Sequence, residues 1–73
     1  MEYKEVTVRH QREDHIVRLY PPRHLADGSD SFRFELNGQS DALNRDKNGI
    51  WIGANWINEE FRRKIGLAFD NNG

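Results

Sequence analysis

Histidines are the residues of this chain best suited to bind a transition metal. His10 and His15 flank the polar segment Gln11–Asp14 and would face each other if the chain folds back there. Zinc sites usually need three or four ligands in fixed geometry, but the third histidine, His24, lies in a sequence typical of a loop, and the chain has no cysteine. We therefore expect two partly exposed histidines at the end of a sheet, and no metal site.

The segment Asn44–Gly49 matches part of the calcium-loop pattern D-x-[DN]-x-[DN]-G. Its first position is Asn44 rather than aspartate, and the twelfth position, where a calcium loop carries its bidentate glutamate, is Asn55. So few charged ligands would bind calcium weakly at best. A turn between two strands explains the same residues, and we expect that turn rather than a calcium site.

No combination of residues in the sequence predicts catalysis. The chain has no cysteine nucleophile, no G-x-S-x-G motif, no glycine-rich phosphate loop and no H-E-x-x-H motif. Its serines, Ser29, Ser31 and Ser40, lie in turn-like segments with no base at a telling spacing. The adjacent acids Glu59 and Glu60 fit the start of a helix, where the dipole favours negative charge. We therefore expect a protein that is not an enzyme, with no catalytic residue and no cofactor.

The segment from Tyr3 to Tyr20 is expected to form a β-hairpin, because apolar and polar residues alternate on either side of Gln11–Asp14. Only some registers bring the apolar residues together on one face, as burial of that face requires. A turn over 11–14 does so by pairing Val8 with Val17, Val6 with Leu19 and His10 with His15. The same register pairs the other face as Arg9 with Ile16, Thr7 with Arg18 and Glu5 with Tyr20.

Three further strands are expected after the hairpin. Phe32, Phe34 and Leu36 alternate with polar residues, which predicts a half-buried strand. Asn37–Gly38 is typical of a type I′ turn and would return the chain as a weak, polar strand over 39–43. A short strand over 50–54 follows, with its side chains predicted to alternate between inward Ile50 and Ile52 and outward Trp51.

The C-terminal part is expected to form an amphipathic helix. Asn55 or Asn58 can cap its start, because an asparagine side chain accepts a hydrogen bond from the first turn. Gly66 lowers helix stability by roughly 1 kcal/mol relative to alanine, which leaves open whether the helix ends there and residues 67–69 pack as a tail. Apolar residues fall within an arc of about 120°: Ile57, Phe61, Ile65, Ala68 and Phe69.

These elements predict an α+β fold in which residues 1–73 form a single domain. A small antiparallel sheet of three to five strands would pack on the C-terminal helix, because a sheet with one apolar face needs a cover. Trp56 is expected to close one end of the core. The core is predicted to contain Val6, Val8, Val17, Leu19, Phe32, Phe34, Leu36, Ile50 and Ile52 from the sheet, with Ile57, Phe61 and Ile65 from the helix.

The sheet face away from the helix is predicted to combine arginines with aromatic rings. Such residues are enriched at the energetic centres of protein interfaces, and they can also stack on bases and contact phosphates. An ordinary solvated face could have the same alternation, but exposed Ile16 and Trp51 favour binding. The predicted partner-binding residues are Tyr3, Arg9, Arg18, Tyr20, Arg33 and Trp51.

The sequence favours a non-enzymatic protein-binding module, such as an adaptor, an inhibitor or an accessory subunit. The alternatives are a nucleic-acid-binding β-sheet domain and a homo-oligomer that uses the same face as its own interface. A net charge of −1 counts against nucleic acid, because proteins that bind it are usually basic. With no apolar stretch of about 18 residues and no signal-peptide pattern, we expect a cytoplasmic protein that does not enter a membrane.

Overall fold

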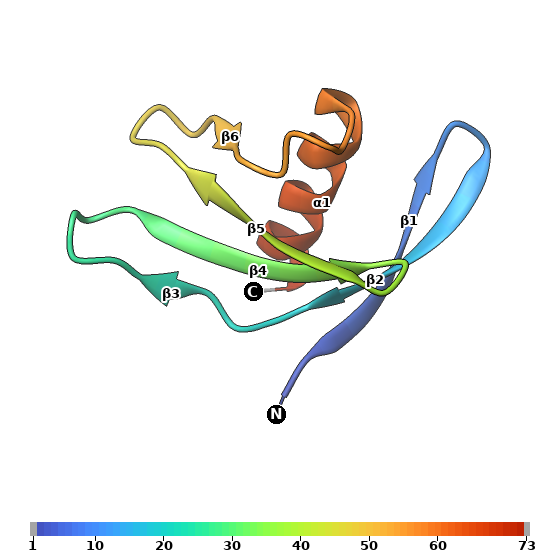
Figure 1. Ribbon diagram of the computed structural model, residues 1–73, viewed down its shortest axis with the longest axis horizontal. Helices are drawn as coiled ribbons and strands as arrows, with labels where there is room; N and C mark the ends of the chain where they lie inside the picture. The colour runs from blue at the N-terminus through green and yellow to red at the C-terminus, as the bar shows by residue number, and fades with distance from the viewer. Residues whose placement is uncertain (1, 73) are drawn as a thin grey trace.

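In the computed structural model, which describes residues 2–72, the chain folds into one antiparallel sheet and one C-terminal helix (Figure 1). Across those residues the sheet has six strands, of which two are only two residues long. The predicted α+β class is confirmed. In chain order the elements are β1 (Lys4–His10), β2 (Glu13–Leu19), β3 (Arg23–His24), β4 (Asp30–Leu36), β5 (Gln39–Arg45), β6 (Trp51–Ile52) and α1 (Glu59–Asn72).

The strand order places β1 at one edge of the sheet. The order is β1-β2-β4-β5-β6, and β3 pairs with β4 beyond the end of β2. Because β2 pairs with β4 only over Val17–Leu19, the tip of the β1–β2 hairpin extends past the ends of β4 and β5 (Figure 1). The long β1–β2 pairing therefore leaves part of the hairpin with no further strand beside it.

The first hairpin turns more tightly than the sequence predicts. Gln11 and Arg12 have φ angles of 52° and 67°, as a two-residue type I′ turn requires. The pairs are therefore Val6 with Val17 and His10 with Glu13, and the predicted register was wrong by two residues. Gln-Arg lacks the Asn-Gly chemistry typical of such a turn, so the sequence favoured a longer loop. A two-residue shift keeps every side chain on its predicted face.

The second hairpin is formed as predicted. Asn37 and Gly38 have φ angles of 54° and 80°, and Leu36 pairs directly with Gln39 across the turn. The return strand β5 continues to Arg45, two residues beyond the predicted end at Leu43. This extension matters for β6, because β6 pairs with the last residues of β5.

The core lies between the sheet and α1. Val17, Phe34, Leu43 and Ile65 have no exposed surface, and Val6 is partly buried against them. The predicted burial of Ile50 and Ile52 was wrong, because these side chains are 57% and 47% exposed. The buried apolar residues are Val8, Val17, Leu19, Phe32, Phe34, Leu36, Leu43, Ala54, Ile57, Phe61, Ile65 and Phe69.

The helix begins after Asn58 and continues through Gly66. The Asn58 side-chain oxygen accepts a hydrogen bond from the backbone N–H of Glu60 at 2.8 Å, which caps the first turn. Past the glycine, α1 runs to Asn72 and buries Phe69. The glycine therefore does not end the helix, and its presence needs a different explanation.

Trp51 supplies that explanation, and the prediction that it points outward was wrong. Trp51 pairs with Arg45, and Arg45 lies on the helix side of the sheet because its NH1 forms an ion pair with Asp70 of α1 at 2.8 Å. The half-buried indole packs against the core beside Phe32. A Cβ placed on Gly66 would lie 2.5 Å from Cδ2 and Nε1 of Trp51. Glycine is therefore required where the indole approaches the helix.

Trp56 does not close the core as expected. Its side chain is 45% exposed, although its ring stacks above Phe34 with centroids 6.4 Å apart. The indole Nε1 donates a hydrogen bond to Oδ2 of Asp41 at 2.5 Å. A tryptophan N–H needs a polar partner, and this bond to β5 holds the ring at the margin of the core.

The Trp51–Gly66 contact predicts an unusual response to alanine. In an exposed helix interior, Gly→Ala gains about 1 kcal/mol. We expect Gly66→Ala to lower the free energy of unfolding by about 1–3 kcal/mol instead, because it overpacks the site. In a Trp51→Ala background the same change should become stabilising. Urea unfolding of the four proteins in this double-mutant cycle measures the effect. A Gly66→Ala protein more stable than the parent would contradict the contact.

Candidate functional site

The sheet face opposite α1, called here the open face, carries five of the six predicted partner-binding residues. Trp51 does not belong to it, because Trp51 packs on the helix side. Ile52 lies there instead, opposite Asn44 of β5. Neighbouring strands contribute to the open face in register. Its members from the hairpin and β4 are Tyr3, Glu5, Thr7, Arg9, Asp14, Ile16, Arg18, Tyr20, Ser31, Arg33 and Glu35.

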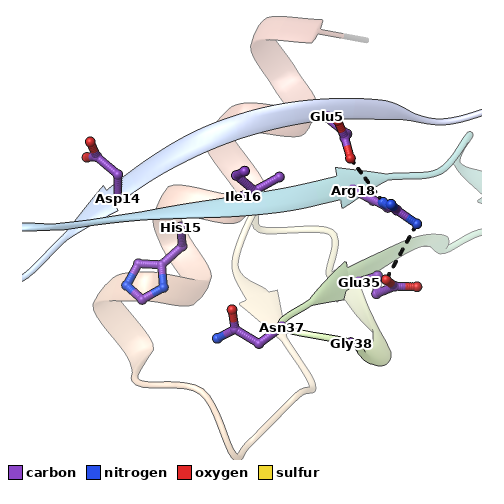
Figure 2. A pocket seen from close by; sticks show the side chains of 8 residues that line it. All are labelled: Glu5, Asp14, His15, Ile16, Arg18, Glu35, Asn37 and Gly38. Atoms are coloured by element: carbon purple, nitrogen blue, oxygen red, sulfur yellow. Dashed lines mark hydrogen bonds and ion pairs between the residues drawn. The ribbon is translucent and has the colours of Figure 1, made fainter.

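Arg18 lies at the centre of a charged row across three strands. Its Nε donates a hydrogen bond to Oε2 of Glu5 on β1 at 3.1 Å, and its NH1 lies 3.7 Å from Oε1 of Glu35 on β4 (Figure 2). The pKa of Arg18 is raised above its ordinary value, mainly by the hydrogen bond to Glu5 and to a smaller extent by the electrostatic interaction with Tyr3. The guanidinium is therefore positively charged, and the carboxylates of Glu5 and Glu35 in the same chain balance its charge.

A second cluster on the open face combines tyrosine rings with guanidinium groups. Tyr3 and Tyr20 have ring centroids 5.7 Å apart. The Arg18 guanidinium lies 4.8 Å from the Tyr3 centroid, and the Arg33 guanidinium lies 5.4 Å from the Tyr20 centroid. These distances are within cation–π range. The sequence predicted the residues but not this pairing, which depends on the true register.

Arg33 differs from the other arginines of the open face. Arg9 forms an ion pair with Asp14 at 3.4 Å and Arg18 with Glu5 at 3.1 Å. Within the described residues, 2–72, Arg33 forms no such pair, and its Nε is buried without a hydrogen-bond partner. A buried donor left unpaired costs free energy. A docking partner cannot reach this buried Nε, but the side chain as a whole is only half-buried, so the other N–H groups of the guanidinium are the ones that an added acceptor could use.

A cavity of about 450 Å³ opens beside the charged row (Figure 2). It occupies the notch where β4 ends and the chain turns through Asn37 and Gly38, next to the unpaired length of β2. Enclosed small-molecule sites are mostly apolar, whereas this open notch has charged walls. It is suited to a protruding polar side chain of a larger partner. Its lining residues are Glu5, Asp14, His15, Ile16, Arg18, Glu35, Asn37 and Gly38.

The histidines do not form the pair that the sequence suggested. His10 is only 6% exposed, so the expectation that it is partly exposed was wrong. Its ring centroid lies 4.7 Å from that of Phe61, and His15 lies 4.9 Å from the same ring. His24 lies in the short strand β3 and not in the loop that the sequence suggested, with Nδ1 2.6 Å from Oδ1 of Asp30. Among residues 2–72 no group of three or more His, Asp or Glu side chains could hold a metal ion.

The segment after β5 forms a turn, and the side chain of its aspartate, Asp46, accepts hydrogen bonds from the backbone of that turn. Oδ1 of Asp46 accepts hydrogen bonds from the backbone N–H groups of Asn48 at 2.8 Å and Ile50 at 2.9 Å. Gly49 has a φ angle of 82°, a conformation that favours glycine. Two backbone donors of the turn therefore share Oδ1 of Asp46, in agreement with the turn interpretation.

The chain matches no protein-family model, no curated protein and no solved structure. Its function is therefore inferred from the geometry of the open face. Within the part of the chain that the structure describes, no helix is long and apolar enough to cross a membrane.

The charged row predicts a stability difference that depends on salt. We expect Arg18→Met, which keeps much of the aliphatic stem over Tyr3 but removes the charge, to lower the urea midpoint at low ionic strength. The difference should shrink in high salt, because the Arg18 and Glu5 side chains are 41% and 52% exposed and salt screens exposed pairs. A loss that is equal at both salt concentrations would show that the charge contributes nothing.

Proposed function

We propose that this chain is a small non-enzymatic protein-binding module that captures its partner on the open face. The observation that carries the proposal is the Tyr20–Arg33 pair, in which the guanidinium lies over the tyrosine ring and forms no ion pair among residues 2–72. Arginines held by an aromatic ring lose little freedom on binding, and they present a planar fork that matches a carboxylate. We infer a partner that places an acidic side chain above Tyr20.

Apolar groups beside this pair support the proposal. Tyr3 is 44% exposed and Ile16 is 62% exposed, and both lie on the same face. Tyrosine and arginine are enriched at the residues that dominate binding energy, where surrounding contacts exclude water. Tyr3 and Ile16 would provide that surrounding contact, while Arg9 and Arg18, already paired with acids, would orient the partner rather than anchor it.

A protein partner suits this face better than a nucleic acid. The carboxylates of Glu5, Glu35 and Asp14 lie between the arginines and would repel phosphate groups, which dominate nucleic-acid affinity. The chain's net charge of −1 points the same way.

We propose a cytoplasmic location for the protein, because a chain with no cysteine fits a reducing compartment.

Affinity capture with matched arginine variants tests the proposal. The tagged chain is incubated with native cell extract, with and without nuclease, and compared with Arg33→Glu and Arg63→Glu. We expect a protein partner that survives nuclease and binds Arg33→Glu at least about tenfold more weakly, because loss of a hot-spot residue costs about 2 kcal/mol or more. Arg63→Glu makes the same charge change at an exposed position of α1 and should bind normally.

Two outcomes would contradict the proposed function. Undiminished capture by Arg33→Glu would remove the open face as the binding surface. Loss of the captured material on nuclease treatment would instead favour the nucleic-acid alternative, and affinity should then fall steeply with salt. Circular dichroism of each variant ensures that any loss of capture reflects the surface and not unfolding.

A further inference from the structure

The free edge of β1 has a defined set of exposed backbone groups. In a two-residue hairpin the flanking residues, here His10 and Glu13, exchange both hydrogen bonds. Even-numbered residues of β1 therefore bond to β2, and Glu5, Thr7 and Arg9 direct their N–H and C=O groups away from it. The same parity follows from the hydrogen bond of the Tyr20 N–H to the Arg33 carbonyl at 3.0 Å. Consistently, the Arg9 carbonyl accepts a hydrogen bond from Lys64 Nζ at 3.0 Å.

We propose that two copies of this chain dimerise by antiparallel pairing of their β1 edges, with Thr7 of one copy opposite Thr7 of the other. The occupant of the edge is thus a second copy of the same strand. A symmetric pair of this kind uses the same patch on both partners and closes without leaving a further edge of β1. The proposal concerns the edge, and it does not depend on the function proposed for the open face.

Charge complementarity selects this register. Pairing Thr7 with Thr7 places Glu5 of each copy opposite Arg9 of the other, which gives two opposite-charge cross-strand pairs. A shift of two residues places Glu5 or Arg9 opposite Thr7 instead and loses both pairs. A shift of four places Glu5 opposite Glu5 or Arg9 opposite Arg9, and like charges directly opposite are destabilising.

The intermolecular pairs extend the charged row found within each chain. Glu35 lies opposite Arg18, Arg18 opposite Glu5, and Arg9 opposite Asp14. The dimer joins these into one row of alternating sign: Glu35, Arg18 and Glu5 of one copy, then Arg9 and Asp14 of the other. A symmetry-related row runs in the opposite direction. Each charge then has neighbours of opposite sign on both sides, except at the ends.

The other face of β1 is compatible with the same register. It places Val6 of each copy opposite Val8 of the other, and Val6 is the β1 valine that the helix leaves only partly covered. The Lys64 contact need not break, because a carbonyl oxygen has two lone pairs and can accept a second hydrogen bond. The pairing therefore adds apolar contact between the two copies.

Sedimentation velocity with reciprocal charge variants tests both the dimer and its register. The wild-type chain should dimerise as its concentration is raised. Glu5→Lys alone and Arg9→Glu alone should each weaken dimerisation at least about tenfold, because each homodimer contains two like-charge pairs. An equimolar mixture should regain a dimer, because the heterodimer pairs the new lysine with the new glutamate and Arg9 with Glu5. Among the registers compared, only this one predicts both the loss in each separate variant and the recovery on mixing.

Clear results would overturn the proposal. A wild-type chain that stays monomeric at the highest concentration reached excludes the dimer. A wild-type dimer whose two variants do not recover on mixing excludes this register. Arg33→Glu should dimerise normally even where it loses its partner, so failure of the edge and failure of the open face are distinguishable. Circular dichroism and urea unfolding of the separate variants exclude misfolding, and Arg63→Glu is the charge-matched control.

Discussion

The packing of α1 against alternate residues of β2, β4 and β5 is the interaction on which the rest of the structure depends. Val17, Phe34, Leu43 and Ile65 are wholly buried, and complete burial of such a side chain is worth about 1.5–3 kcal/mol each. Because successive side chains of a strand point to opposite faces, this burial leaves the residues between them on the open face. A chain with a single helix can cover only one face of its sheet, and the other face is available for recognition.

Much of this arrangement could be predicted from the sequence, because alternation assigns faces without requiring the exact register. The hairpin register predicted for β1 and β2 was wrong by two residues, yet Val8, Val17 and Leu19 are buried as expected. The pairing of open-face residues was more sensitive. The predicted register paired Arg18 with Thr7, whereas the true one pairs it with Glu5. The alternating charges of the open face therefore became visible only in the structure.

Trp51 and Gly66 mark the limit of that reasoning. β6 contains only two residues, so alternation within it carries almost no information, and its orientation comes from pairing with Arg45. Local propensity treats Gly66 as a weak point in a helix. In the folded chain it is the position where the indole of Trp51 lies against the helix, a contact between segments whose proximity no local pattern predicts. Loss of Trp51 from the predicted face leaves Tyr20 and Arg33 as its central residues.

The edge and the open face, taken together, constrain how a dimer could engage partners. In the proposed pairing the two copies of Arg33 are five strand intervals apart across the sheet, roughly 24 Å at about 4.8 Å per interval. They are also eight residues apart along the strands, because Arg33 lies in the row of Tyr3 and Tyr20, which adds an offset of roughly 27 Å and makes the separation about 36 Å. Neighbouring strands also rotate by about 20–25°, so the two Tyr20–Arg33 sites would diverge by roughly 100–125°. A flat, rigid partner could not contact both sites. Two separate partners, or one flexible segment with two acidic groups, could do so, and only the flexible segment would gain from a raised effective concentration at the second site.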